Sequence, residues 1–177
     1  SERNRILESE HLDTLDYDSI ARDVFNHHFK NYKNITENDI TKYIYKNLSF
    51  SFNKDDFEIH NHDYEAIITL LISQFNNQLM LNKNKINDEE LFQQFLRKSV
   101  LKAIDSAWIE QVDYLQQLKS NVNQRQKGQR NSIFEYHKVA LDSFKQMEDI
   151  IKHRIIRNLC LSIIDQQKNN DLTIHFP

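Results

Sequence analysis

The chain has 177 residues, of which 39% are hydrophobic and 28% are charged, and its formal net charge is -3. It holds one glycine and one proline, too few for the turns of an all-β sandwich or for the glycine-rich loops that approach phosphate in nucleotide-binding folds. Both fold classes are therefore excluded, and a mostly α-helical chain is predicted. The slightly negative net charge gives no support to nucleic-acid binding.

The first half of the chain predicts several helices. Residues 1–9 have the pattern of the end of a helix. Asp16 or Asp18 can cap a second helix, which carries apolar residues at helical spacing. Thr36 and Asp39 form the pattern of a capping box and open a short third helix.

The middle of the chain is less regular. Residues 48–60 are the least helical stretch, and the alternation of Leu48, Phe50 and Phe52 permits a short extended segment. From Tyr64 to Met80 a wide apolar stripe predicts another helix.

The second half predicts two long helices. Asp88 precedes about 33 residues of helical periodicity, and the pattern stops in the polar segment 121–131 around Gly128. Ser132 and Glu135 then form a capping box before a second long helix. Two long amphipathic helices joined by a short loop are expected to run antiparallel and to bury their stripes against each other. The stripe of the second helix comprises Phe134, Leu141, Phe144, Met147, Ile151, Ile155 and Leu159.

Charge divides between the two halves. Residues 1–97 hold 11 basic and 17 acidic side chains, a net of -6, whereas residues 98–177 hold 12 and 9, a net of +3. The loop between the two long helices is basic, with Arg125, Lys127 and Arg130 and no acid between Leu115 and Phe134. A solvated turn or a partner-binding loop both fit this pattern.

Several other site classes receive little support. Cys160 is the single cysteine, which excludes an internal disulfide and a multi-cysteine zinc site, and its apolar neighbours favour a buried, unreactive thiol. Adjacent His27 and His28 point about 100° apart on a helix and cannot share a metal ion. His60 and His62 could share one in an extended segment, but spacing fixes no third ligand. No apolar run approaches the roughly 20 residues of a membrane span, and no signal peptide is recognised.

The region of the two long helices also resembles a known family. Residues 104–110 (Ile-Asp-Ser-Ala-Trp-Ile-Glu) resemble the Leu-Asp-Ser-x-Trp-x-Glu-His-Leu stretch of SecA, the ATP-driven motor of bacterial protein export. The register holds without gaps: Leu118, Arg125, Gln129, Glu135-Tyr136 and Phe144 fall on residues of the family's pattern. Residues 1–7 and 23–25 are similar to its Ser-x-Arg-Asn-x-x-Leu and Glu-Asp-Val-Phe.

The resemblance implies an all-α fold with a small helical wing domain and a long antiparallel two-helix hairpin. Its parts would be the end of a scaffold helix (1–10), a helical wing (11–97), a two-helix finger (98–166) and a short tail (167–177). The chain would be a C-terminal piece of a longer motor, without enzymatic activity or cofactor of its own, and ATP and Mg²⁺ would belong to motor domains outside it. The alternative interpretation is a helical adaptor or scaffold unrelated to transport, and a Walker-type motif upstream of Ser1 would decide against it.

Partners follow from the same resemblance. The finger would face the SecYEG channel and the preprotein, beside anionic lipids, on a protein attached peripherally to the cytoplasmic face of the plasma membrane. The residues implied for partner binding at the finger tip are Arg125, Lys127, Gly128, Gln129 and Arg130. Trp108, Leu118 and Phe144 are expected to be structural.

The chain also departs from the family's pattern. Lys127 stands where the family usually has a tyrosine, Gln126 replaces the preceding glycine, and Gly128 replaces the following alanine. Gln111 replaces the histidine that follows Trp-x-Glu. These differences indicate an accessory, second SecA of a Gram-positive bacterium.

Overall fold

Five α-helices and a two-stranded sheet make up the part of the chain that the structure, a computed structural model, describes: residues 15–56, 63–125, 132–166 and 171–177. This confirms the mainly α-helical prediction, while the helix expected over residues 1–9 lies outside the described residues. In chain order the elements are α2 (Tyr17–Phe29), α3 (Glu37–Asn47), the 3₁₀ turn η2 (Lys54–Asp56), α4 (Tyr64–Ile86), α5 (Glu89–Arg125), α6 (Ser132–Leu161), β1 (Ile163–Gln166) and β2 (Leu172–His175).

The helices begin where capping residues predict. The Asp16 carboxylate accepts from the backbone N–H of Ser19 at 3.0 Å, which satisfies one of the free donors of the first turn of α2. Thr36 and Asp39 exchange side-chain and backbone hydrogen bonds of 3.0 and 3.1 Å, so the predicted capping box is present at α3. Asp88 accepts from the Leu91 N–H at 3.0 Å in the first turn of α5.

α4 and α5 meet at a sharp break. The N–H of Asn87 still bonds to the Lys83 carbonyl at 3.0 Å, but its own backbone is left-handed, with φ of 50°. Asparagine tolerates this conformation better than most residues with a β-carbon, so it can end a helix where glycine is absent. α5 therefore starts two residues later in a new direction.

The extended segment considered for residues 48–52 is absent from the structure. The N–H groups of Leu48 and Ser49 both bond to the Ile44 carbonyl, at 2.8 and 2.9 Å, so the chain continues the last turn of α3. Leu48 and Phe52 are buried, whereas Phe50 between them is 69% exposed. The alternating apolar residues therefore belong to a turn in which Leu48 and Phe52 are buried, and not to a strand.

A short β-hairpin follows α6 and was not predicted from the sequence. β1 and β2 are antiparallel, with Ile164 opposite Ile174 and Gln166 opposite Leu172. Ile164 and Leu172 are 3% and 9% exposed and belong to the main hydrophobic cluster. The predicted tail thus contains a folded element that adds to the core.

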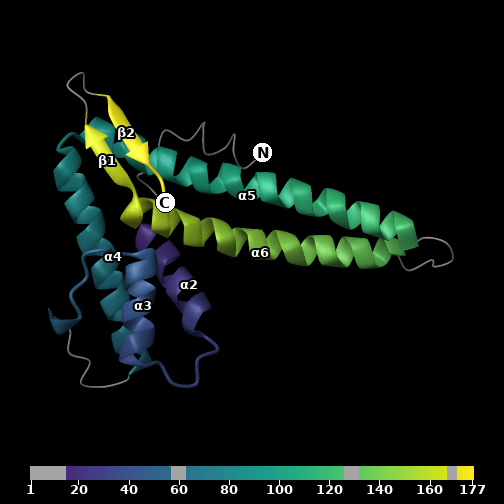
Figure 1. Ribbon diagram of the computed structural model, residues 1–177, viewed down its shortest axis with the longest axis horizontal. Helices are drawn as coiled ribbons and strands as arrows, with labels where there is room; N and C mark the ends of the chain where they lie inside the picture. Colours follow the sequence, from purple (N-terminus) through teal and green to yellow (C-terminus); the bar gives the residue numbers. More distant parts are fainter. Residues whose placement is uncertain (1–14, 57–62, 126–131, 167–170) are drawn as a thin grey trace.

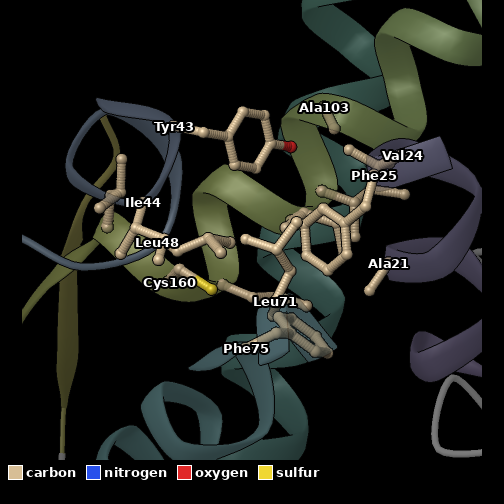
Figure 2. Packing of buried hydrophobic residues seen from close by; sticks show 14 of the residues in the cluster. Ala21, Val24, Phe25, Tyr43, Ile44, Leu48, Leu71, Phe75, Ala103 and Cys160 are labelled. Atoms are coloured by element: carbon tan, nitrogen blue, oxygen red, sulfur yellow. The ribbon is translucent and has the colours of Figure 1, made fainter. Parts of the chain in front are cut away.

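The core lies where the small helices meet the base of the long pair. In Figure 2 side chains from α2, α3, α4, α5 and α6 point toward one another, among them Phe25, Tyr43, Phe75, Ala103 and Cys160. Burial of such side chains contributes roughly 1.5–3 kcal/mol each in transfer free energy. A single cluster therefore joins residues from both sides of the predicted wing and finger boundary.

Two buried asparagines hold the elements in register. The side-chain amide of Asn82 on α4 donates to the Leu159 carbonyl in the last turn of α6 at 2.7 Å, and this satisfies an acceptor with no partner inside its own helix. Asn158 on α6 donates to the Ser99 carbonyl on α5 at 3.0 Å. Because a buried amide without a partner is costly, both bonds favour one axial position of α6 over its alternatives.

α5 and α6 form a long antiparallel hairpin that extends away from the other elements (Figure 1). α2, α3 and α4 pack at one end of this hairpin, and the β-hairpin lies at the same end. The predicted boundary between residues 97 and 98 falls inside α5, so no break in the backbone marks it. The division into wing and finger stays a prediction.

Candidate functional site

The α5–α6 hairpin is the feature most distinct from the compact core, and polar contacts join its two helices near the base. Arg154 on α6 binds both carboxylate oxygens of Glu110 on α5 at 2.8 Å and donates to the Ser106 hydroxyl at 3.1 Å. The Nη2 group contacts both Glu110 oxygens and Nη1 donates to Ser106, so the guanidinium is held by two side chains of α5 at once. Since Glu110 is exposed, we assign this pair a role in alignment more than in stability.

A second polar contact lies farther along and is buried. Gln111 is 6% exposed, and its side-chain amide donates to the Ser143 hydroxyl at 2.7 Å. The Ser143 hydroxyl in turn donates to the Ala140 carbonyl at 2.7 Å. Gln111 stands at a position that sequence reasoning treated only as a departure from a pattern, and its partner is 32 residues away, so no local signal identified the pair.

Trp108 and Phe144 meet across the hairpin, with ring centroids 6.0 Å apart at an interplanar angle of 59°. Trp108 is half-buried and packs against the main cluster. Leu118 and Phe144 are also half-buried. Trp108 and Phe144 therefore meet between the two helices, none of the three residues is fully buried, and their structural role stays a prediction.

The distal half of the hairpin, defined as residues 109–125 of α5 and 132–148 of α6, is poorly covered. None of its described side chains belongs to the main hydrophobic cluster. Here the predicted burial of the α6 stripe is wrong at two positions, because Phe134 is 72% and Leu141 58% exposed. Two helices alone can cover only one side of each other, and Figure 1 shows the far part of the hairpin extending away from α2, α3 and α4.

The exposed apolar side chains of the distal half come from both helices. Ile109 and Val112 are three residues apart on α5, and Phe134 and Leu141 are seven apart on α6, so each pair shares one face of its helix. Exposed contiguous apolar surface on a soluble protein is a common mark of an interaction site. Among the side chains described in this half, the large exposed apolar ones are Ile109, Val112, Tyr114, Ile133, Phe134, Val139 and Leu141.

The structure gives no geometry for the predicted finger tip. Lys127, Gly128, Gln129 and Arg130 lie outside the described residues. Arg125 is the last residue of α5, and only its backbone is described. The partner-binding role of these five residues remains a prediction.

α2 docks on α6 through two ion pairs at the edge of a cleft. Lys152 on α6 binds Asp23 on α2 at 3.0 Å, and His27 lies 3.7 Å from Asp149. All four side chains are substantially exposed, so each pair contributes at most about 1 kcal/mol and salt weakens it. The apolar contacts of Val24 and Phe25 below them provide most of the attachment.

Two histidines lie beneath these ion pairs. Burial, together with the positive charge of Arg157, lowers the pKa of His153 to about 4. Burial and the charge of Lys46 also lower the pKa of His28, whose ring lies 4.5 Å from that of Tyr43. Both side chains are therefore neutral at pH 7, and neither acts there as a cation.

The described part of the chain gives no support to a histidine metal site or to Cys160 as a nucleophile. His27 contacts Asp149 and His28 stacks on aromatic rings, while His60 and His62 lie outside the described residues. No group of three or more histidine, cysteine or acidic side chains with the spacing of a metal site occurs among the residues that are described. Cys160 is 3% exposed, and burial raises the pKa of its thiol, as expected for a core residue.

None of the helices in the described part of the chain combines the length and the apolar character needed to span a membrane.

Comparisons with known proteins agree on one family. The family model described as "SecA Wing and Scaffold domain" matches residues 1–162. The chain is 49% identical over 176 residues to proteins named "Protein translocase subunit SecA 2" from Staphylococcus aureus strains Newman, Mu3 and NCTC 8325. These matches cover 99% of this chain and 22% of each relative, so the chain spans about a fifth of the length of the curated relatives it matches.

Proposed function

The chain belongs to the SecA family, as its wing and scaffold region, and from this premise we propose that it is the part of a protein-export motor that contacts the SecY channel and the preprotein. The observation that carries the proposal is the long α5–α6 hairpin with an apolar, uncovered distal half. The similarity to SecA 2 supports assignment to an accessory Sec system of a Gram-positive bacterium. No observation favours an adaptor unrelated to transport.

The two ends of the hairpin suit different tasks. The base is held by the main core, by Asn158 and by the Arg154–Glu110 pair, so it moves with the rest of the chain. The distal half has exposed apolar side chains that could contact an unfolded preprotein or a channel surface. Such a hairpin transmits displacement as a stiff lever, because each α-helix keeps its own backbone hydrogen bonds without tertiary support.

The basic loop supplies the electrostatic part of the proposal. Arg125, Lys127 and Arg130 carry three positive charges that a helical turn does not require. Near anionic lipid headgroups each basic residue contributes about 1 kcal/mol, and salt screens this attraction within a Debye length. The proposed partners are the cytoplasmic mouth of the channel, the preprotein and the adjacent lipid surface, with the protein attached peripherally to the membrane.

ATP hydrolysis is assigned to domains of the parent protein outside this chain. The 177 residues contain no Gly-x-x-x-x-Gly-Lys motif that could cradle phosphates. Calorimetry of the chain with Mg²⁺ and ATP should give no binding heat comparable to that of a motor ATPase. Binding in the micromolar range would contradict this division of tasks.

The loop charges provide the test of the channel contact. Replacement of Arg125, Lys127 and Arg130 by glutamine in the full-length protein should impair export while basal ATPase activity and thermal stability stay nearly unchanged. A matched control replaces Lys30, Lys33 and Lys42, three exposed lysines outside the distal half of the hairpin, by glutamine. If export survives the loop change, or falls equally in both variants, the loop is an ordinary solvated turn.

A further inference from the structure

A cleft at the base of the hairpin concentrates positive charge at a distance from the loop. Its volume is about 270 Å³, and it is lined by Lys102, Ser106, Glu110, Arg154, Arg157, Asn158, Phe176 and Pro177. A cavity holds one water molecule in roughly 10–15 Å³, so this cleft has room for a polyatomic group with several waters.

Helical spacing brings the polar side chains together. Lys102, Ser106 and Glu110 are four residues apart and lie along one face of α5, and Arg154 and Arg157 are neighbours on the facing side of α6. β2 packs against α5, and Phe176, the residue after it, adds an apolar wall. The cleft is therefore built from three elements that the core fixes in place.

The charges of the cleft are not balanced internally. Three cations line it, and Glu110 is the one acid among the described residues of the lining. Both oxygens of Glu110 are taken by Arg154, whose guanidinium also donates to Ser106. The side chains of the lining thus keep a net charge of about +2, which belongs to Lys102 and Arg157 once the Arg154–Glu110 pair is counted as neutral.

Arg157 adds an independent observation. Its Nε atom is buried and has no hydrogen-bond partner among the described residues. Leaving a buried donor unsatisfied costs about 1–3 kcal/mol, and more when the group is charged. Its positive charge acts on His153 and Tyr43, which are both neutral at pH 7. Because this atom is buried, an acceptor in the cleft reaches it only when the Arg157 side chain shifts.

We infer that the cleft between Lys102 and Arg157 binds the phosphate group of a phosphate monoester. Such a group carries a charge of about -1.5 to -2 at pH 7, which matches the net charge of the lining better than a single carboxylate does. The planar guanidinium of Arg157 suits the geometry of phosphate oxygens, and Lys102 supplies a mobile point charge at the open side. Both a soluble ester and a lipid headgroup carry such a phosphate, and the experiment separates the two sources.

The test follows the Nε–Hε signal of Arg157 by NMR in the ¹⁵N-labelled chain, assigned by its loss in Arg157→Lys. Inorganic phosphate is titrated against chloride at equal ionic strength, because general screening must be held constant. We expect a saturable shift with a dissociation constant on the order of 1–10 mM. Lys102→Gln should weaken binding about fivefold or more. Lys145→Gln, which removes an exposed lysine of α6 outside the cleft, should change it less than about twofold.

Two further arms distinguish the sources of phosphate. A soluble ester predicts that glycerol 3-phosphate reproduces the shift and that phosphatidylcholine vesicles containing phosphatidic acid do not. A lipid headgroup predicts that these vesicles broaden the signal, that inorganic phosphate reverses the effect, and that pure phosphatidylcholine has none. A shift that stays linear with phosphate, or equal weakening in Lys102→Gln and Lys145→Gln, overturns the inference. Circular dichroism of both glutamine variants verifies that they fold.

Discussion

The buried contact between Gln111 and Ser143 predicts a measurable coupling across the hairpin. Ser143→Ala removes the acceptor of a 2.7 Å hydrogen bond and leaves the Gln111 amide unpaired at 6% exposure. An unsatisfied buried group costs about 1–3 kcal/mol, and for a chain of this size each 1 kcal/mol lowers the melting temperature by about 2–4 °C. Gln111→Met, a change of similar shape, should cost less, because the Ser143 hydroxyl still donates to the Ala140 carbonyl.

The double variant tests whether Gln111 and Ser143 interact directly with each other. Gln111→Met with Ser143→Ala removes both partners, so no buried donor is left unpaired and the cost should be nearly neutral. Its loss of unfolding free energy should therefore fall at least about 1 kcal/mol below the sum of the single losses. Urea denaturation followed by circular dichroism measures all three variants.

A matched control isolates the hydrogen bond from helix propensity. Ser120→Ala introduces the same substitution at an exposed position of α5 and should be neutral or slightly stabilising. Equal effects of Ser143→Ala and Ser120→Ala would refute the argument. Additive losses in the double variant would refute it as well.

Three other changes test separate parts of the account. Trp108→Ala should lower the unfolding free energy by about 2–3 kcal/mol, less than for a fully buried aromatic residue because the ring is half-buried, and a loss under about 0.5 kcal/mol would place the ring outside the interface. Phe134→Ala should change stability by less than about 0.5 kcal/mol, since its ring is 72% exposed, and a loss above 1 kcal/mol would show that the chain itself buries it. His153 has a lowered pKa in the folded state, so the unfolded chain binds more protons between about pH 4 and 6.5 and stability falls as pH is lowered through that window. His153→Gln should flatten the decline of the melting temperature over that range, and parallel curves for the two proteins would contradict it.

The helices were predictable because their signals are local. Asp16, Thr36 with Asp39, and Asp88 accept backbone hydrogen bonds within three residues of themselves, so a short sequence window contains the whole interaction. The antiparallel hairpin followed from two long apolar stripes and a short polar loop. The caps, the stripes and the loop can all be recognised from residue types and their spacing along the chain.

The β-hairpin and the polar contacts lacked such signals. β1 and β2 have four residues each, too few for a period of two to stand out beside the helical pattern of α6. Gln111 and Ser143 look like ordinary surface residues until the packing of two helices places them together. The cleft with Lys102 and Arg157 likewise depends on residues brought together by the fold.

The predicted burial of the apolar stripe in the distal half was wrong for a different reason. An apolar pattern predicts that a face will be covered, but it does not say by which molecule. Phe134 and Leu141 follow the helical period of α6, yet no described element lies over them. Their exposure is the reason that the proposed partner surface was placed on this half of the hairpin.

Photo-crosslinking from the hairpin tests the central claim most directly. A photoreactive amino acid at Phe134 in the full-length protein is compared with the same group at Ile163, a 59% exposed residue that begins β1 just beyond the other end of α6. In membrane vesicles that contain the SecYEG channel, with ATP and a preprotein, the account predicts adducts to the channel or the preprotein from Phe134 well above those from Ile163. Equal or absent adducts at both positions would contradict the assignment of the hairpin as the part that reaches the channel.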